Sequence, residues 1–264
     1  MDDAADVETQ HKNHAVYFVP GLHRGLRVLE IVAAARRPLS ITEIASELGL
    51  TRSSVFRLIY TLRHMGFLEE EQSKQFALGP RVLNIGFAFL ASKDIIEIAR
   101  PELEALRDET LVSAHLAIRD ERDVLYLSCV QTRSGFLSNM NVGSRVPAYA
   151  SPMGWLLLAG LPQAELEELF RKERFVPLTS QTPTSTPELV ATVEAAAARG
   201  HVVSRGVMEA AGSSISAPIV DRRGTVVAAI DISGPDSAFD LDQIDGRYLA
   251  AVRAAARRIS ERLG

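Results

Sequence analysis

Between residues 38 and 66 the apolar side chains recur at the spacing of two short helices separated by a tight turn. Ser40 and Glu43 have the spacing of a capping box at the start of the first helix, and Thr51 is placed to cap the second. Gly49 allows the left-handed backbone that ends a helix sharply. The expected buried stripes are Ile41, Ile44, Ala45 and Leu48 in the first helix and Val55, Leu58, Ile59, Leu62 and Met65 in the second.

The flanking segments extend this pattern. A helix with apolar positions at Leu26, Leu29, Ile31, Val32 and Ala35 precedes the pair. After it, the apolar residues 67–68 and 76–78 enclose a polar tip at 69–75, which predicts a β-hairpin. Three helices followed by a two-stranded wing are typical of a winged helix-turn-helix.

The second helix of the pair carries a polar face suited to DNA, because the N-terminal end of such a helix contacts base edges while its flanks hold phosphates. The residues expected to bind DNA are Ser40, Thr42, Thr51, Arg52, Ser53, Ser54, Arg57, Arg63 and Lys74. The alternative is an ordinary helical hairpin with a solvated polar face.

Residues 81–92 predict a helix that is apolar on nearly every side, and its expected partner is a second copy of the chain. We therefore expect a disordered tail at 1–19, a DNA-binding head at 20–80, a dimerising linker helix at 81–92 and a second domain at 93–264.

The second domain alternates short strands and helices. We expect a helix at 94–110, kinked or divided at Pro101, and a terminal helix at 241–262. Strands are expected at 115–120, 123–130, 136–142, 201–204, 213–220 and 226–233, and further helices at 151–159, 164–170 and 187–199, the last capped by Thr186. Hairpin-linked strands with segregated helices indicate an α+β fold with an antiparallel sheet.

The distribution of charge along the sequence supports the assignment of residues 20–80 as the DNA-binding head. The chain has 264 residues and a net charge of −4, yet residues 20–80 carry +2, with −3 on either side. The single cysteine, Cys129, excludes an internal disulfide and fits a reducing cytoplasm; we expect it to be a small buried residue of a strand. No apolar run approaches the roughly 20 residues that span a membrane, and the polar N-terminus is unlike a signal peptide.

Catalytic signatures are missing from the sequence. The six histidines have no metal-ligand spacing, and there is no glycine-rich phosphate loop or nucleophile elbow. We therefore expect no enzyme, metal or cofactor. Two alternatives remain: a metabolite-binding module or enzyme whose winged helix contacts proteins, and an architectural DNA binder without a ligand.

The segment VGSRVPAYASPMGWLLLAG is the best candidate for a small-molecule site. Ser151 is a good helix cap and Pro152 a good first-turn residue. Free amides at a helix start bind anions, which favours a carboxylate ligand. The alternative is a well-capped helix with a purely structural role.

Taken together, RGLRVLEIV, SITEIASELGLTRSSVFRLIYTLRHMGFL, FALGPRVLNIG, VGSRVPAYASPMGWLLLAG and ISAPIVDRRGTVVAAIDISGP resemble the IclR family of bacterial transcriptional regulators. The resemblance implies a winged helix-turn-helix, a linker helix and a GAF-like effector domain. It also implies a repressor-type regulator that binds its operator as a homodimer or a dimer of dimers. VGSRVPAYASPMG looks most like regulators of aromatic-acid catabolism.

The family's effector contacts carry over to Pro152, Met153, Gly154, Trp155, Ser204, Gly212, Ser214, Asp231 and Ser233. Several positions depart from the family, including Gly206 and Val207, where acidic residues are usual and Glu209 is displaced nearby. Pro152 has no N–H, Trp155 replaces a common lysine or arginine and is expected to wall the pocket or stack on a ring, and Asp231 replaces a common serine. The expected function is a ligand-responsive regulator of a catabolic operon with a small carboxylic acid effector.

Overall fold

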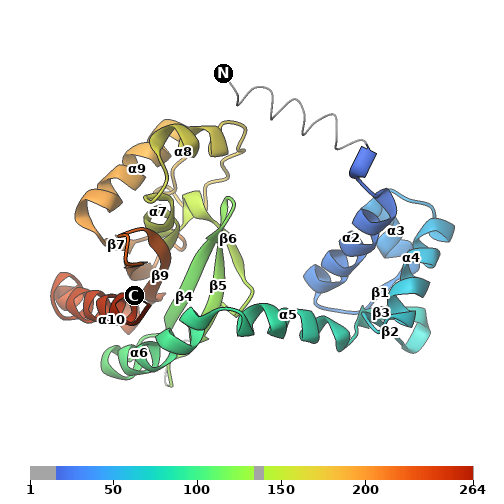
Figure 1. The fold of residues 1–264 in the computed structure, drawn as a ribbon, viewed down its shortest axis with the longest axis horizontal. Helices are drawn as coiled ribbons and strands as arrows, with labels where there is room; N and C mark the ends of the chain where they lie inside the picture. Colours follow the sequence, from blue (N-terminus) through green and yellow to red (C-terminus); the bar gives the residue numbers. More distant parts are fainter. Residues whose placement is uncertain (1–15, 134–139, 264) are drawn as a thin grey trace. The chain divides into compact units, whose positions relative to one another are not determined.

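The computed structural model describes residues 16–133 and 140–263, and the chain divides into two compact units between Ser92 and Lys93 (Figure 1). Each unit has a buried apolar core of its own. Residues 1–15 of the expected tail lie outside the described residues.

The first unit is a winged helix-turn-helix, as the sequence predicts. Its elements are α2 (Pro20–Ala35), β1 (Leu39–Ser40), α3 (Ile41–Leu48), α4 (Arg52–His64), β2 (Leu68–Glu71) and β3 (Gln75–Leu78). The strands pair antiparallel in the order β1-β3-β2, and β2 and β3 form the wing.

The local signals of this unit are confirmed in detail. The Ser40 hydroxyl accepts from the Glu43 amide at 3.3 Å, and the Glu43 carboxylate accepts from the Ser40 amide at 2.8 Å. Gly49 has a φ of 63°, and the Thr51 hydroxyl accepts from the Ser54 amide. These three features fix where α3 ends and α4 begins.

Two expected core positions are wrong. Met65 lies just beyond α4 and is 50% exposed, because the chain turns away from the core at the end of that helix. On α2 the buried residues are Val28 and Val32, whereas Leu26 is 52% exposed.

The linker helix α5 (Arg81–Ala91) buries none of its own residues. Leu83, Ile85 and Phe87 are 58–62% exposed and Phe89 is 42% exposed. Exposure of four large apolar side chains on one short helix marks an interaction surface rather than an ordinary solvated helix.

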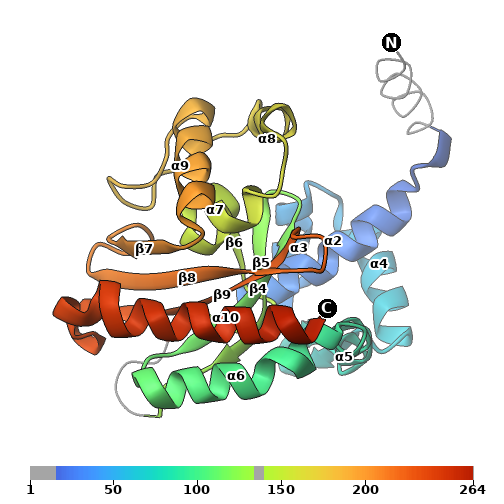
Figure 2. The ribbon, with the colours of Figure 1, turned by 60° about the vertical axis from the view of Figure 1, so that its left-hand side comes forward.

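The second unit is a six-stranded antiparallel sheet between two helical layers. Its elements are α6 (Asp94–Thr110), β4 (Ala114–Asp120), β5 (Asp123–Val130), β6 (Arg145–Pro147), α7 (Pro152–Leu158), α8 (Gln163–Phe170), α9 (Thr186–Arg199), β7 (Val202–Arg205), β8 (Gly212–Val220), β9 (Val226–Pro235) and α10 (Leu249–Leu263). The strand order is β6-β5-β4-β9-β8-β7. Helices α6 and α10 cover one face, and α7 with α8 and α9 lies on the other (Figure 2).

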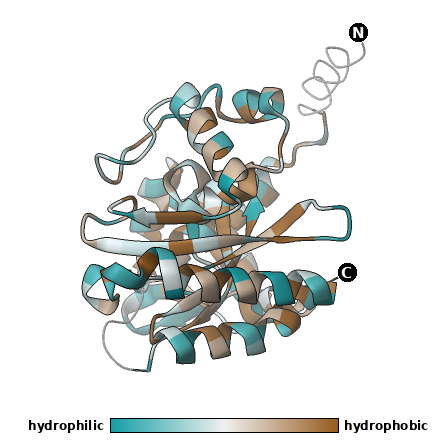
Figure 3. Cartoon of the chain, turned by 90° about the vertical axis from the view of Figure 1, so that its left-hand side faces the viewer, coloured by the Kyte–Doolittle hydropathy of each residue, from teal (hydrophilic) through white to brown (hydrophobic). Residues whose placement is uncertain are grey.

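Hydrophilic and hydrophobic residues alternate along α10, as expected for a helix with one face on a sheet (Figure 3). Its buried residues are Ala251, Val252, Ala255, Ala256 and Ile259. Helices α6 and α10 cover one face of the sheet, so a ligand site on the sheet has to lie on the face that carries α7.

Several predicted boundaries in this unit need correction. Residues 136–139 of the strand expected at 136–142 lie outside the described residues, and 140–142 are not strand; the strand in this region is β6. Ser185 rather than Thr186 caps α9, because its hydroxyl accepts from the Glu188 amide.

Two expected helices also differ from the prediction. Pro101 does not divide α6, since the exposed second turn tolerates one missing backbone donor. The terminal helix begins at Leu249 instead of Leu241. The preceding residues form two short helical turns, held where the Asp240 amide donates to the Tyr248 hydroxyl.

Candidate DNA interface and ligand pocket

Three of the four cations predicted to bind DNA are exposed and have no salt bridge in the part of the chain that the structure describes. Arg52 and Arg57 lie on α4, and Lys74 lies at the tip of the wing. None of the three forms a salt bridge within the described ranges 16–133 and 140–263. They can therefore pair with phosphates without breaking a contact in the protein.

Most of the other expected DNA-binding residues have structural contacts of their own. Ser40, Thr51 and Ser54 take part in the helix caps, and the Ser53 hydroxyl lies 3.1 Å from that of Thr51. Thr42 is exposed on α3.

Arg63 holds the wing rather than facing solvent alone. Its guanidinium lies 2.6 Å from the Glu70 carboxylate and 5.9 Å from the centroid of the Phe76 ring. Both partners belong to the wing strands, so Arg63 ties α4 to β2 and β3.

Two aromatic residues on α4 were not among the predicted DNA contacts. Phe56 is 54% exposed and Tyr60 is 63% exposed, and their rings lie one helical turn apart with centroids 6.5 Å from each other. An exposed aromatic residue on a recognition helix can contact a thymine methyl group. Arg52, Phe56 and Tyr60 are spaced four residues apart, which places them on one side of a helix. This spacing could have identified the two aromatic residues from the sequence.

The second unit holds a pocket between the sheet and the start of α7, with about 600 Å³ of empty space including its open mouth. Its lining combines hydroxyl groups with apolar side chains. The described residues that line it are Tyr126, Met140, Pro152, Ser204, Val207, Met208, Glu209, Gly212, Ser213, Ser214, Ser233, Gly234 and Pro235. They include no lysine, arginine or histidine.

A row of three serines crosses the floor of this pocket. Ser204 on β7 pairs with Ser214 on β8, and Ser214 pairs with Ser233 on β9. The hydroxyls of Ser204 and Ser214 lie 3.1 Å apart, and either can be the donor. The alternation of strand residues places all three on the same face of the sheet.

The next row along these strands contains a buried pair, His115 on β4 and Asp231 on β9. The ring Nδ1 lies 2.7 Å from the Asp231 carboxylate and 3.3 Å from the Ser233 hydroxyl. His115 is fully buried and Asp231 is 4% exposed. The His115 Nε2 atom and the hydroxyl of Ser216, which pairs with Asp231, have no hydrogen-bond partner among the described residues.

Two further titratable groups face this pair from β5. Burial, reinforced by the Asp231 charge, raises the pKa of the Tyr126 phenol well above its usual value and the pKa of the Cys129 thiol to about 12. Both groups are therefore neutral at physiological pH.

We expect Cys129 to be almost inert toward thiol reagents in the folded protein. At pH 8 a thiol with a pKa of about 12 is only ~0.01% thiolate, so labelling should be at least about a thousandfold slower than for an ordinary cysteine. Because this is the only cysteine, absorbance with Ellman's reagent reports it directly. Rapid labelling should appear in urea; labelling of the native protein at the same rate would contradict the assignment.

The start of α7 is tightly packed and its amides are largely used. Pro152 has no N–H, the Gly154 amide donates to the Ser151 hydroxyl, and the Trp155 amide donates to the Ser151 carbonyl. A Cβ atom at Gly154 would lie 2.2 Å from the carbonyl oxygen of Ala148. These contacts support the structural interpretation of this helix cap over an anion site.

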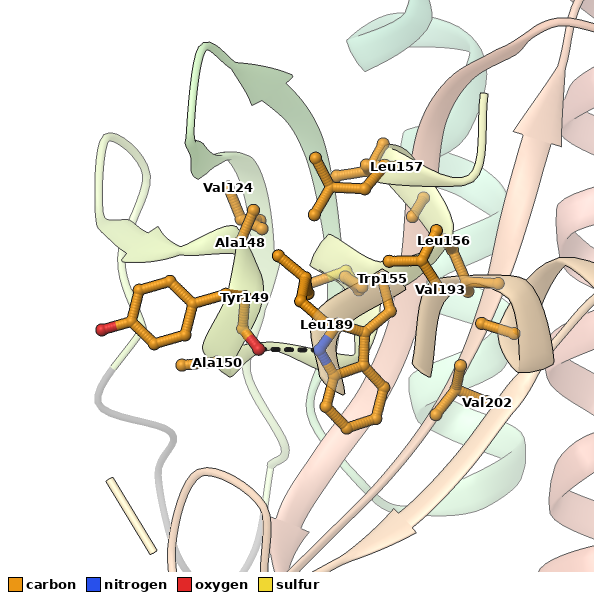
Figure 4. Packing of buried hydrophobic residues seen from close by; sticks show 14 of the residues in the cluster. Val124, Ala148, Tyr149, Ala150, Trp155, Leu156, Leu157, Leu189, Val193 and Val202 are labelled. Atoms are coloured by element: carbon orange, nitrogen blue, oxygen red, sulfur yellow. Dashed lines mark hydrogen bonds between the residues drawn. The ribbon is translucent and has the colours of Figure 1, made fainter. Parts of the chain in front are cut away.

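Trp155 is part of the core rather than of the pocket lining. It is 7% exposed, and its indole N–H donates to the Tyr149 carbonyl oxygen at 2.8 Å (Figure 4). Its ring belongs to the core cluster that contains Leu189, Val193 and Val202, and it is not among the residues that line the pocket at Ser233.

The pocket therefore brings together only part of the expected effector set. Pro152, Ser204, Gly212, Ser214 and Ser233 line it. The remaining four do not: Met153, Gly154, Trp155 and Asp231. The predicted effector set lacks eight lining residues. Tyr126, Ser213, Gly234 and Pro235 reach the pocket through strand pairing, and Met140, Val207, Met208 and Glu209 reach it from loops; neither arrangement has a local signal in the sequence.

Comparisons with known proteins agree with this architecture. Residues 21–72 match the IclR helix-turn-helix domain, and residues 87–261 match the C-terminal domain of bacterial IclR transcriptional regulators. The Pca regulon regulatory protein of Pseudomonas putida is 30% identical over 247 residues, which cover 93% of this chain and 84% of that protein.

Solved structures share the fold over nearly the whole chain. A Rhodococcus sp. RHA1 protein, whose structure is described as that of a transcriptional regulator, has 33% identity and a TM-score of 0.80, covering 93% of this chain and 98% of that one. A Microbacterium hydrocarbonoxydans IclR homologue complexed with 4-hydroxybenzoate has 24% identity and a TM-score of 0.78, covering 92% and 98%.

No helix in the described ranges is long and apolar enough to cross a membrane. Within the same ranges, no cluster of histidine, cysteine or carboxylate side chains could hold a metal ion.

Proposed function

Because the chain belongs to the IclR family of bacterial transcriptional regulators, which are DNA-binding proteins and not enzymes, we propose that it controls a catabolic operon in response to a small carboxylic acid. An aromatic acid is the first candidate. The acid occupies the pocket beside α7 and changes the affinity of the head for its operator.

The observation that carries this proposal is the character of the pocket. Hydroxyls line one side of it, and Val207, Met208 and Pro152 supply an apolar wall. Such a mixture suits a small molecule with an apolar body and one polar end. Two names support the choice of aromatic acids: the Pca regulon regulator among the relatives and the homologue bound to 4-hydroxybenzoate.

The proposal extends to domains and assembly. We assign DNA binding to residues 20–80, dimerisation to 81–92 and effector binding to 93–264, with a homodimer as the unit that binds a two-fold operator in the bacterial cytoplasm. Dimers then pair into tetramers where the operator has two sites.

A ligand screen tests the effector. Benzoate, 4-hydroxybenzoate, propionate and related acids are added to the full-length protein, and specific binding raises the melting temperature by mass action. Acids that bind should also shift the mobility of the protein with DNA from its own upstream region. A panel in which no acid changes either quantity contradicts the proposal.

The DNA interface leads to a separate prediction. Arg52→Ala should weaken binding by about 1–3 kcal/mol at the operator and relax base preference, because Arg52 lies at the base-reading end of α4. Arg57→Ala should weaken binding to operator and random DNA equally, as expected for a phosphate contact. Fluorescence anisotropy with operator DNA and with random DNA measures the affinity that each variant loses.

The control is Arg223→Ala, which removes one positive charge from a turn of the second unit. It should leave both affinities unchanged. Equal losses on operator and random DNA for Arg52→Ala and Arg57→Ala would refute the separate roles.

A further inference from the structure

The buried pair lies directly behind the pocket. Ser233 lines the pocket, and its hydroxyl is 3.3 Å from the His115 Nδ1. Tyr126 also lines the pocket, and its ring meets the His115 ring edge-on with centroids 5.7 Å apart. Any molecule on these two residues is therefore one side chain away from the pair.

The charge of this region conflicts with an acidic effector. We take the pair to rest as a neutral imidazole that donates its Nδ1–H to the carboxylate, so that the pair carries one negative charge. The described lining of the pocket adds Glu209 and no cation. An effector carboxylate would then approach a buried negative charge in a region of low dielectric, where repulsion is strong.

One proton removes the conflict. The pair becomes neutral when it is protonated, either as imidazolium with carboxylate or as imidazole with carboxylic acid. We propose that the pair takes up one proton from solvent when an acid binds, so that this pocket accepts its effector as an anion together with a proton. This inference rests on the proposed function, because it needs an acid in the pocket.

The neighbouring groups do not supply that proton. Tyr126 and Cys129 on β5 keep their protons, because burial raises the pKa of both groups. Helix α7 has no titratable side chain, and on the opposite face the Glu102 carboxylate of α6 is held by Arg258 at 2.6 Å. Glu209 is the remaining titratable group of the pocket lining, and it is exposed.

This proton uptake makes the binding of acids, but not of neutral analogues, depend on the His115–Asp231 pair. When the His115–Asp231 pair is protonated, it has no net charge and does not repel the anion. When the pair releases the proton, the repulsion returns. Neutral analogues of the same shape need no proton, so their binding should not depend on pH. On this proposal, Asp231 makes acid binding in this chain pH-dependent.

Isothermal titration calorimetry of the full-length protein tests the inference. Benzoate and 4-hydroxybenzoate are titrated between pH 7 and 9 in buffers of different ionisation enthalpy, with their primary amides as neutral probes. We expect about one proton taken up per acid bound and a dissociation constant that rises about tenfold per pH unit. The amides should bind with no uptake.

Asp231→Asn should reduce uptake to near zero and make acid binding independent of pH, because it removes the negative charge that the proton neutralises. Glu209→Gln is the matched control, since it removes a carboxylate from the same pocket and should leave uptake intact. The wild-type and amide titrations decide the matter even if the Asp231 variant does not fold.

Acid binding without proton uptake overturns the inference and leaves the proposed function standing. Uptake lost in Glu209→Gln and retained in Asp231→Asn also overturns it. Failure of every acid to bind overturns the proposed function, and this inference with it.

Discussion

Gly154→Ala is expected to destabilise the second unit by about 3 kcal/mol or more, although alanine is the better helix former by about 1 kcal/mol. The added Cβ would lie 2.2 Å from the Ala148 carbonyl oxygen and 2.6 Å from the Ala148 Cα. These are backbone atoms, so no rotamer change relieves the clash, and α7 has to move away from residues 148–150. Urea unfolding followed by circular dichroism measures the loss.

The matched control is Gly160→Ala, two residues after the end of α7. There a Cβ would meet Val226 at 3.8 Å, which is ordinary contact, and stability should change little. Unchanged stability in Gly154→Ala would mean that the close approach is not maintained in solution. Because Pro152 lines the pocket, any shift of α7 should also weaken acid binding.

Phe87→Asp is expected to convert the proposed dimer to a monomer and to reduce operator affinity at least a hundredfold. Phe87 is 62% exposed on α5 and shares a face with Leu83, four residues earlier. In a dimer this face is buried, and a buried unpaired carboxylate is strongly destabilising. Light scattering gives the mass, and anisotropy with operator DNA gives the affinity.

Asn84→Asp is the matched control, because it adds the same charge at an exposed polar position of the same helix. It should stay dimeric. A monomeric wild-type protein, or a Phe87→Asp variant that remains dimeric, would show that α5 is not the dimer contact.

Local signals made the head predictable from sequence. The Ser40–Glu43 capping box and the Thr51 cap depend on residues three positions apart, and Gly49 supplies the turn on its own. Arg63 shows the limit of such signals. Its position on the polar face of α4 suggested DNA, but the folded wing brings Glu70 and Phe76 against it.

The pocket was only partly predictable, because strand pairing decides which residues meet. His115 and Asp231 are 116 positions apart, and only the pairing of β4 with β9 brings them together. Trp155 was expected at the pocket because it is a large aromatic residue in the right segment. The Tyr149 carbonyl instead supplies a hydrogen bond inside the core, where the indole can be satisfied without a ligand.

The Ser204–Ser214 hydroxyl pair bears on which ligands this pocket can accept. Either hydroxyl can donate to the other, so rotating two O–H bonds turns this part of the floor from donor to acceptor without moving a heavy atom. A ligand that presents a carbonyl there and one that presents a hydroxyl are accommodated alike. The hydrogen-bonding capacity of this floor therefore does not by itself select between two ligands that differ only in this way.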